Sequence, residues 1–513
     1  MTLEKLEKEL EKIHDQLLKQ EPVANAIASS VHPEYRASAK NLYRYLQLRN
    51  TDIRAIQDGL AELGISSLGS GAGYVYENIS SALKLVKVLN NKTWEKNKDI
   101  ESIGFTGSKK LLVQHANMLF KTTSKVHDTE IMVTMPDEAA TDKKLIRKLR
   151  KAGMGIARIN LSHGKEKLWT KILKKSHSVA QEIQQPIKIY MDLPGPKIRV
   201  ANIYIKKEDD TSFSATPFIP IAKKSQLLLV KNNSPYLSKG KKKEKTPSDI
   251  PLIEVSIPQI IDNLKVGQQV FFDDGAIEAK VLSLGNNTAS LVIKNAYKKK
   301  LRTEKGINLP NTQLDLPSLT KEDLSLLPFI TSHADLMGYS FVSNAEDVSM
   351  LYKELQTLGD TDTGIVFKIE NKEAFENLPA ILFRAMKRPN IGVMIARGDL
   401  AVEIGFERIS EVQNEILWLC EAAQIPVVWA TQVLDHMAKK GMATRAEISD
   451  ATISAQAECV MLNKGPYIVE ATKTLKNVLL RMEAHSQKSK NTLRALKVAK
   501  KGLRNIHKEF TKK

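Results

Sequence analysis

From residue 130 to residue 462 the sequence repeats one pattern, in which a short apolar run is followed by a stretch with helical spacing of apolar residues. Nearly continuous apolar runs are typical of parallel strands that are covered on both faces. Eight strand–helix units predict an α/β fold built on a (β/α)8 barrel rather than a doubly wound sheet. The eight expected strands are Glu130–Thr134, Ile156–Ile159, Ile187–Met191, Ala334–Tyr339, Ile365–Lys368, Ile391–Ile395, Pro426–Trp429 and Cys459–Leu462.

The rest of the chain divides around this barrel by its residue patterns. Residues 1–128 show helical spacing of apolar residues amid charge and predict an all-helical N-terminal extension. The barrel itself is expected in two parts, 129–199 and 307–486. Between them, residues 200–306 hold short Val, Ile and Leu runs separated by Gly, Asn and Asp, which predict an inserted small β-barrel domain. Residues 487–513 form a basic C-terminal tail.

The composition of the chain indicates which binding partners and which cellular setting are expected. The formal net charge of +19 over 513 residues favours anionic partners such as nucleotides and phosphorylated metabolites. Nucleic acid is a less favoured partner, because the basic tail also fits a solvated amphipathic helix. Cys420 and Cys459 lie in apolar segments without metal-ligand spacing and predict a reduced, cytoplasmic setting. We expect neither a signal peptide nor a membrane span, and a homo-oligomer stays open.

A glycine-rich run at residues 69–73 has two interpretations. It could cradle a phosphate, as glycine-rich loops do when they follow a strand and precede Lys-Ser or Lys-Thr. No strand is expected before this run and no such pair follows it. A flexible connector between helices is therefore the favoured interpretation.

Charged residues stand where several expected strands end, which is where (β/α)8 barrels form their sites. Lys368 and Glu370 are two residues apart, so both side chains leave one face of a strand. Asp399 follows the next strand. A cation grouped with two carboxylates indicates a metal ion and an anionic substrate. A strand-end ion pair would explain any one of these residues alone, but several polar strand ends in one barrel favour an active site.

The ends of the second and third strands add groups that suit a phosphate. Arg158, Asn160 and Ser162 alternate along the chain and share one face. The third strand is followed by one carboxylate and two cations, Asp192, Lys197 and Arg199.

Several of these segments resemble signature segments of the pyruvate kinase family. They occur in the family's order from about residue 130 to residue 471, with the inserted domain in the expected place. The segments are Ala157–Gly164, Lys305–Pro310, Lys368–Asn371, Ala396–Ile404, Ala430–Gln432 and Thr444–Asp450.

The resemblance implies a glycolytic phosphoryl transfer between phosphoenolpyruvate and ADP that gives pyruvate and ATP. Glu370 and Asp399 match the ligands of Mg²⁺ or Mn²⁺. Lys368 matches the cation that neutralises the moving phosphoryl group and the enolate. Gly398 and Asp399 match the backbone amides that bind the substrate carboxylate, and Thr431 matches the residue that lines the pyruvate pocket and assists protonation. The inserted domain is implied to act as a lid.

The resemblance also implies a nucleotide side of the site. The positions that match residues associated with the nucleotide and its phosphates are Arg158, Asn160, His163, Arg199 and Lys305. The resemblance also implies that Arg158 is a catalytic residue, together with Lys368 and Thr431.

One departure from the family pattern concerns the monovalent cation. Asn160, Ser162 and Asp192 keep three of the four expected oxygen ligands, but Leu193 replaces the threonine. Lys197 stands where potassium-dependent members carry glutamate and is the candidate substitute for the cation. This combination is similar to that of potassium-independent members, so we expect activity without K⁺.

Other departures lie around the same site. Met135 stands where the family has glycine, and Asn463–Pro466 replaces the family's Ser-Gly-Glu-Thr, which puts Lys464 in place of an acid. The family's C-terminal regulatory domain is also expected to be absent, so its sugar-bisphosphate control and its tetramer contacts are not expected here.

Two alternatives stay beside the kinase hypothesis. The same barrel and metal pair could serve a lyase or aldolase that acts on another pyruvate-like enolate, but Arg199 and Lys305 favour a nucleotide. A catalytically weak scaffold could bind partners or nucleic acid through its basic surface. Retention of Lys368, Glu370 and Asp399 favours an enzyme over a scaffold.

Overall fold

The computed structural model describes residues 1–66, 68–95, 97, 99–122, 129–206, 213–232, 250–314, 316–483 and 497–510. Its centre is a closed barrel in which eight strands pair in parallel, in the order β1-β18-β17-β16-β15-β14-β3-β2. The predicted (β/α)8 barrel is thus confirmed, and every expected strand overlaps an observed one. The barrel strands are β1 (Glu130–Thr134), β2 (Met154–Asn160), β3 (Lys188–Asp192), β14 (Leu336–Tyr339), β15 (Gly364–Ile369), β16 (Ile391–Ala396), β17 (Val427–Ala430) and β18 (Cys459–Leu462).

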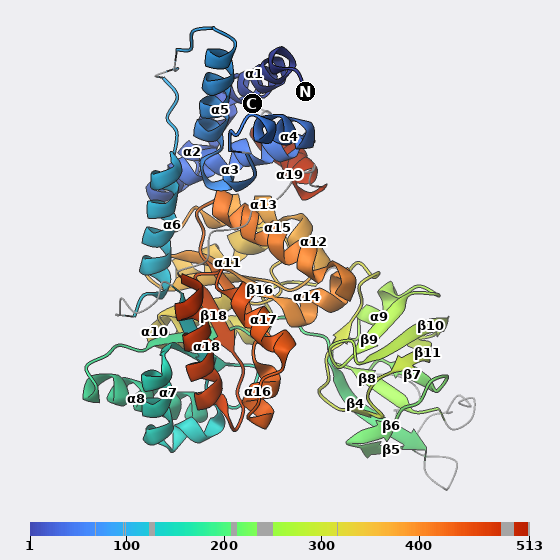
Figure 1. Cartoon of the computed structure of the whole chain (residues 1–513). Coiled ribbons are helices and arrows are strands. Elements are labelled where there is room, and N and C mark those ends of the chain that lie inside the picture. Colours follow the sequence, from blue (N-terminus) through green and yellow to red (C-terminus); the bar gives the residue numbers. More distant parts are fainter. Residues whose placement is uncertain are drawn as a thin grey trace.

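Helices follow the strands and cover the outside of the barrel (Figure 1). Their apolar faces pack on side chains that point outward from the strands, in one continuous core. The helices are α7 (Lys143–Ala152), α8 (Glu166–Glu182), α10 (Lys321–His333), α11 (Ala345–Thr357), α12 (Lys372–Glu376), α13 (Leu378–Ala385), α14 (Arg397–Ile404), α15 (Ile409–Ala422), α16 (Asp435–Lys440), α17 (Arg445–Ser454) and α18 (Ile468–Glu483).

The inserted domain follows β3 and lies beside the barrel (Figure 1). It has its own apolar core and contains a mixed eight-stranded sheet of order β13-β9-β10-β11-β7-β8-β4-β5, with a separate pair β12-β6. Its elements are β4 (Val200–Lys206), β5 (Phe213–Thr216), β6 (Phe218–Pro220), β7 (Gln226–Val230), β8 (Leu252–Val255), α9 (Ile260–Asn263), β9 (Gln269–Phe272), β10 (Ile277–Gly285), β11 (Thr288–Ala296), β12 (Lys300–Arg302) and β13 (Ile307–Asn308).

The N-terminal extension is helical, as predicted, and lies over one side of the barrel (Figure 1). Its apolar residues join the outer core of the barrel, so the two parts share one packed interior. The extension contains α1 (Leu3–Lys19), α2 (Glu21–Ser29), α3 (Arg36–Arg49), α4 (Arg54–Glu62), α5 (Val75–Leu89) and α6 (Phe105–Phe120).

The C-terminal helix α19 (Lys497–Phe510) packs between the extension and the barrel (Figure 1). Residues 487–496 and 511–513 of the predicted tail lie outside the described residues. Val498, Leu503 and Ile506 of α19 are buried, and its main neighbours are α3 and α13. The helix is amphipathic as expected, but the expectation of a solvated helix is corrected, because its apolar face is covered.

The glycine-rich run of the extension is also more ordered than a flexible connector. It forms two short 3-10 turns, Leu68–Ser70 and Ala72–Tyr74. Gln424 of the barrel donates its Nε2 hydrogen to Gly73 O at 2.9 Å. A Cβ at Gly73 would lie 2.0 Å from Ser108 Oγ of α6. The run is therefore a close packing contact between the extension and the barrel.

The C-terminal end of α6 closes the barrel at the N-terminal ends of its strands. Leu119 and Phe120 are buried among the inward-pointing side chains of the strands. Gly364 and Gly392 leave the space for this, since a Cβ at either would lie 2.6 Å from a Leu119 methyl group. Lys188 also donates to Leu119 O at 2.6 Å. The apolar side chains at the end of α6 therefore seal this end of the barrel, and the last carbonyl groups of the helix hold the Lys188 ammonium.

No helix among the described residues combines the length and the apolar composition that crossing a membrane requires.

Leu119→Ala should leave a cavity in this seal. We expect the free energy of unfolding to fall by about 3 kcal/mol, the usual cost of truncating a buried leucine. Urea unfolding followed by circular dichroism measures the change. Val113→Ala on the same helix is the control, because Val113 is 54% exposed, and it should stay within about 0.5 kcal/mol of the wild type. Equal losses from both variants would contradict the role of Leu119.

Candidate active site

The polar ends of the barrel strands meet at one end of the barrel, which we call the mouth. Parallel strands bring all their C-terminal ends to the same side. β2 and β3 are paired with Asn160 opposite Asp192. Lys368 and Glu370 stand at the end of β15, and α14 starts directly after β16 with Asp399 in its first turn. The residues predicted from the strand ends are therefore gathered around one opening.

Lys368 is a buried ammonium between two carboxylates. Its Nζ lies 3.1 Å from Glu370 Oε1 and 3.5 Å from Asp192 Oδ1, and it donates to Ser340 Oγ at 2.8 Å. Burial opposes the charged form, but the attraction of Asp192 and Glu370 outweighs burial and raises the pKa of the Lys368 ammonium. The side chain is therefore held as a cation.

Asp192 holds a second cation at the mouth. Its Oδ2 accepts from Arg158 Nε at 2.5 Å and its Oδ1 accepts from the Tyr190 hydroxyl at 2.9 Å. Arg158 also donates to Thr134 Oγ1 at 2.8 Å. Burial alone would raise the pKa of the Asp192 carboxyl, but the charges of Arg158 and Lys368 outweigh burial and lower it. Both oxygens of Asp192 thus have partners within the protein.

Glu370 and Asp399 are the carboxylates predicted to hold a metal ion. They line one cavity of about 610 Å³ at the mouth. Burial raises the pKa of Glu370, and the negative charge of Asp399 raises it further against the opposing effect of Lys368. In the described part of the chain no three His, Cys, Asp or Glu side chains form a metal cage. Two carboxylates that repel each other fit Mg²⁺ or Mn²⁺, with water and substrate oxygens as the remaining ligands.

Asp399 forms an ion pair with Lys197. Lys197 Nζ lies 3.0 Å from Asp399 Oδ1 and 2.9 Å from Oδ2. The family resemblance groups Lys197 with Asn160, Ser162 and Asp192 as a candidate substitute for a monovalent cation. In the structure Asn160 Oδ1 instead accepts from Ser162 N–H at 3.1 Å, and the Lys197 ammonium lies on the carboxylate of Asp399.

Glu403 is a third acidic residue that lines this cavity. The sequence predicts no role for it. Asn308 Nδ2 donates to Glu403 Oε1 at 3.2 Å and lies 3.4 Å from Asp399 Oδ1. Burial and the negative charge of Asp399 raise the pKa of Glu403 to about 7, although the Asn308 hydrogen bond opposes this. Glu403 follows Asp399 by four residues on α14, and this helical spacing was the signal that could have found it.

Arg397 holds the start of α14 against the end of β17. Its guanidinium donates to Ala430 O at 3.0 Å and to Thr431 O at 2.7 Å, and it forms a two-point ion pair with Asp450. Gly398 N–H donates to Thr431 Oγ1 at 2.8 Å. Thr431 has a φ of 64°, a strained conformation of the kind found at functional sites. The amide and hydroxyl predicted for the substrate pocket are therefore in contact. Arg397 and Asp450, for which the sequence predicts no role, fix this contact in place.

The residues predicted for the nucleotide are only partly brought together. Burial lowers the pKa of His163, and the positive charges of Arg199 and Lys464 lower it further, so these three groups share one region. Lys305 instead pairs with Asp273 of the inserted domain at 3.0 Å. Arg199 and His163 thus lie in one region. The backbone of Lys305 lies beside Arg199, whose guanidinium donates to Glu304 O at 3.1 Å, but the Lys305 ammonium is held by Asp273.

The substituted positions surround the charged cluster. Met135 and Leu193 are buried at the ends of β1 and β3, and neither side chain contains an oxygen atom. Lys464 lies near the surface, with its Nζ 3.3 Å from Asp137 Oδ1.

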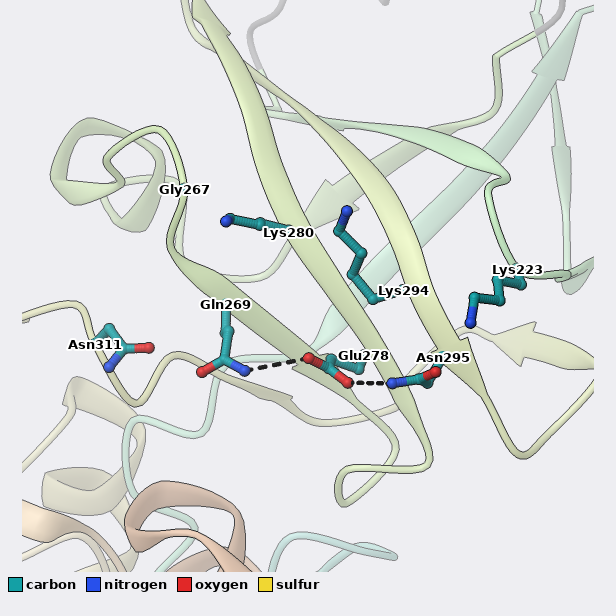
Figure 2. Close-up of a pocket in the computed structure, with 8 residues that line it drawn as sticks. All are labelled: Lys223, Gly267, Gln269, Glu278, Lys280, Lys294, Asn295 and Asn311. Carbon is teal, nitrogen blue, oxygen red and sulfur yellow. Dashed lines mark hydrogen bonds between the residues drawn. The ribbon is translucent and has the colours of Figure 1, made fainter.

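A further cavity of about 540 Å³ lies on the inserted domain (Figure 2). Glu278 lies at its centre and accepts from Gln269 at 3.1 Å and from Asn295 at 2.7 Å. The lysines in Figure 2 reach in different directions and do not converge on one point. This cavity therefore lacks the convergent polar groups of the mouth. It is lined by Lys223, Gly267, Gln269, Glu278, Lys280, Lys294, Asn295 and Asn311.

Comparisons with known proteins agree on one family. Residues 126–471 match the family model described as pyruvate kinase, barrel domain. A pyruvate kinase of Bacillus licheniformis is 32% identical over 362 residues, which cover 69% of this chain and 57% of the relative. One of Candida albicans is 30% identical over 345 residues, which cover 66% of this chain and 63% of the relative. The aligned part thus spans less than two thirds of the length of these relatives.

Glu403→Gln tests the raised pKa of the buried acid. A glutamate pKa that rises from 4.5 to about 7 on folding gives stability that is full below pH 4.5 and is lost as the pH rises through 7. Between pH 5 and pH 8 the free energy of unfolding of the wild type should therefore fall by about 2 kcal/mol more than that of Glu403→Gln. Urea unfolding at both pH values measures this. Glu138→Gln at an exposed glutamate should follow the wild type, and parallel pH profiles for all three proteins would contradict the assignment.

Proposed function

The chain belongs to the pyruvate kinase family, and from this membership we propose that it transfers the phosphoryl group of phosphoenolpyruvate to ADP, forming pyruvate and ATP. The observation that carries the proposal is the buried Lys368 ammonium between Asp192 and Glu370, next to the cavity that Asp399 lines. A fixed cation beside two carboxylates that fit a divalent ion suits a reaction in which negative charge moves from a phosphoryl group to an enolate.

The charged cluster would act by electrostatic stabilisation. Mg²⁺ or Mn²⁺ at Glu370 and Asp399 would, when bound, neutralise charge on the phosphoryl and carboxylate oxygens of the substrate. Lys368 would stabilise the negative charge that develops on the enolate oxygen. Because its ammonium is already held by Ser340 and the two carboxylates, little reorganisation is needed during the reaction. Arg158, oriented by Asp192, would face the transferring phosphoryl group.

The start of α14 would hold the other end of the substrate. A substrate carboxylate could accept from the amides of Gly398 and Asp399, as anions do at helix N-termini. It would replace the Thr431 hydroxyl as the partner of Gly398 N–H, and the hydroxyl would keep its own hydrogen bond to Ala430 O at 2.7 Å. Thr431 would then assist delivery of a proton from solvent to the methylene carbon of the enolate, which yields pyruvate.

ADP would bind on the side of the mouth that carries His163 and Arg199. The positive charge of this cluster suits a polyphosphate, and Asn160 borders it at the end of β2. Lys305 would approach from the inserted domain. If this domain closes over the mouth as a lid, it excludes water and prevents transfer of the phosphoryl group to water.

We also propose that the reaction does not require K⁺. Both oxygens of Asp192 already have protein partners, and two of these partners, Arg158 and Lys368, are cations. Leu193 offers no oxygen at the fourth expected ligand position, and Lys197 adds a fixed positive charge to the mouth, with its Nζ 2.9 Å from Asp399 Oδ2. The charge that a monovalent cation would balance is therefore already balanced by side chains.

An assay of pyruvate formation from phosphoenolpyruvate, ADP and Mg²⁺ tests the function and its cation requirement together. With tetramethylammonium as the sole monovalent cation, we expect kcat to stay within about twofold of its value in K⁺, because no charge at Asp192 is left unbalanced. A strict requirement for K⁺ would refute the K⁺ proposal, and no turnover in either salt would refute the kinase.

Lys368→Met tests the role of the buried ammonium. Removing this charge should lower kcat by about 10²-fold or more, because the developing negative charge loses a preorganised partner. The same pyruvate assay measures the effect. Lys387→Met, at an exposed lysine outside the mouth, is the matched control and should keep wild-type kcat. Turnover of Lys368→Met near the wild-type value would remove Lys368 from the mechanism.

A further inference from the structure

Two chain segments join the inserted domain to the barrel, and together they form a paired hinge. The outgoing segment follows β3 and the returning segment precedes α10. Arg199 and Gly306 form an antiparallel bridge between them. Backbone hydrogen bonds from Val200 N to Lys305 O and from Ile307 N to Ile198 O, both 2.9 Å, continue the pairing. A movement of one segment therefore carries the other with it.

Both segments of this hinge are tied to the same face of α14, on the side of the barrel that faces the inserted domain (Figure 1). Lys197 of the outgoing segment contacts both oxygens of Asp399. Asn308 of the returning segment donates to Glu403. Asp399 and Glu403 are four residues apart, so they project from one side of the helix. The acidic face of α14 thus anchors the inserted domain.

The Lys197–Asp399 pair sits in a built site rather than on an open surface. The exposed fractions of the two side chains are 21% for Lys197 and 14% for Asp399. Gly306 gives room for the lysine stem, because a Cβ there would lie 3.0 Å from Lys197 Cε. The ammonium contacts both carboxylate oxygens at about equal distance, so it occupies the positions from which Asp399 would bind a metal ion.

We propose that Lys197 is a latch that a divalent cation opens: its ammonium must leave Asp399 before the metal binds there, and its departure releases the outgoing segment of the hinge from α14, while Asn308 still holds the returning segment at Glu403. This inference rests on the proposed metal site of Glu370 and Asp399. An ammonium and a divalent cation on one carboxylate repel each other, so their binding is competitive. Lys197 is therefore a positioning residue, which couples metal loading to the freedom of the inserted domain.

Metal affinity gives the first test. Mn²⁺ is titrated into the full chain without phosphoenolpyruvate or nucleotide, and free Mn²⁺ is measured by electron paramagnetic resonance. Lys197→Met should bind Mn²⁺ about tenfold more tightly than the wild type, the order expected when a like charge leaves a partly buried site. Lys197→Gln is a second neutral variant and should behave alike. Lys231→Met removes a lysine–aspartate pair elsewhere in the inserted domain, and it should keep the wild-type affinity.

Hydrogen exchange gives the second test. In the wild type, Mn²⁺ should raise deuterium uptake in peptides that cover residues 194–199 of the outgoing segment. In Lys197→Met the uptake of these peptides should be high already and should not respond to Mn²⁺. Unchanged Mn²⁺ affinity in both neutral Lys197 variants, or wild-type uptake that ignores Mn²⁺, would overturn the latch.

Asp399→Asn separates failure of the latch from failure of the metal site. Loss of Mn²⁺ binding in Asp399→Asn together with wild-type affinity in the Lys197 variants would overturn the latch and keep the metal site. Unchanged Mn²⁺ binding in Asp399→Asn would overturn both.

Discussion

Two cations and two carboxylates lie buried against one another at the mouth of the barrel: Arg158, Lys368, Asp192 and Glu370. An unpaired charge buried in this way costs several kcal/mol, so each of these groups depends on the others. The opposing charges keep Lys368 protonated where burial alone would favour its neutral form. They also hold it at one point, since it lies against both carboxylates. The position of the ammonium, and with it the chemistry that the mouth can perform, follows from this balance of buried charge.

The charged cluster and the apolar seal lie at opposite ends of the barrel. At the N-terminal ends of the strands the seal is apolar, and Leu119 of the helical extension fills the space that Gly364 and Gly392 leave. At the opposite end the strands finish in polar residues around a cavity. This division is common in (β/α)8 barrels, because the packed interior tolerates variation of the segments at the mouth. The departures at Met135 and Leu193 lie beside the charged cluster and leave its members in place.

Helix α14 contributes both to the proposed substrate and metal site and to the attachment of the inserted domain. Its first turn carries Asp399 and the amide of Gly398, and its next turn carries Glu403. Arg397 fixes the start of the helix to the end of β17. The same short element thus faces the proposed substrate pocket and the hinge of the inserted domain. Any ligand that changes the partners of Asp399 acts on both at once, which gives a physical reason for coupling between loading of the site and movement of the inserted domain.

Local patterns in the sequence were enough to predict the eight strands, the helical extension, the inserted domain and the grouping of Lys368, Glu370 and Asp399. Strand and helix periods set which face a side chain leaves, and parallel strands must end on one side. Only the tertiary structure paired Lys197 with Asp399, 202 residues away, and Asn308 with Glu403. It also covered one face of α19 and packed the glycine-rich run against Gln424. Periodicity assigns a side chain to a face, but the partner on that face depends on how distant segments pack and on which charges burial forces together.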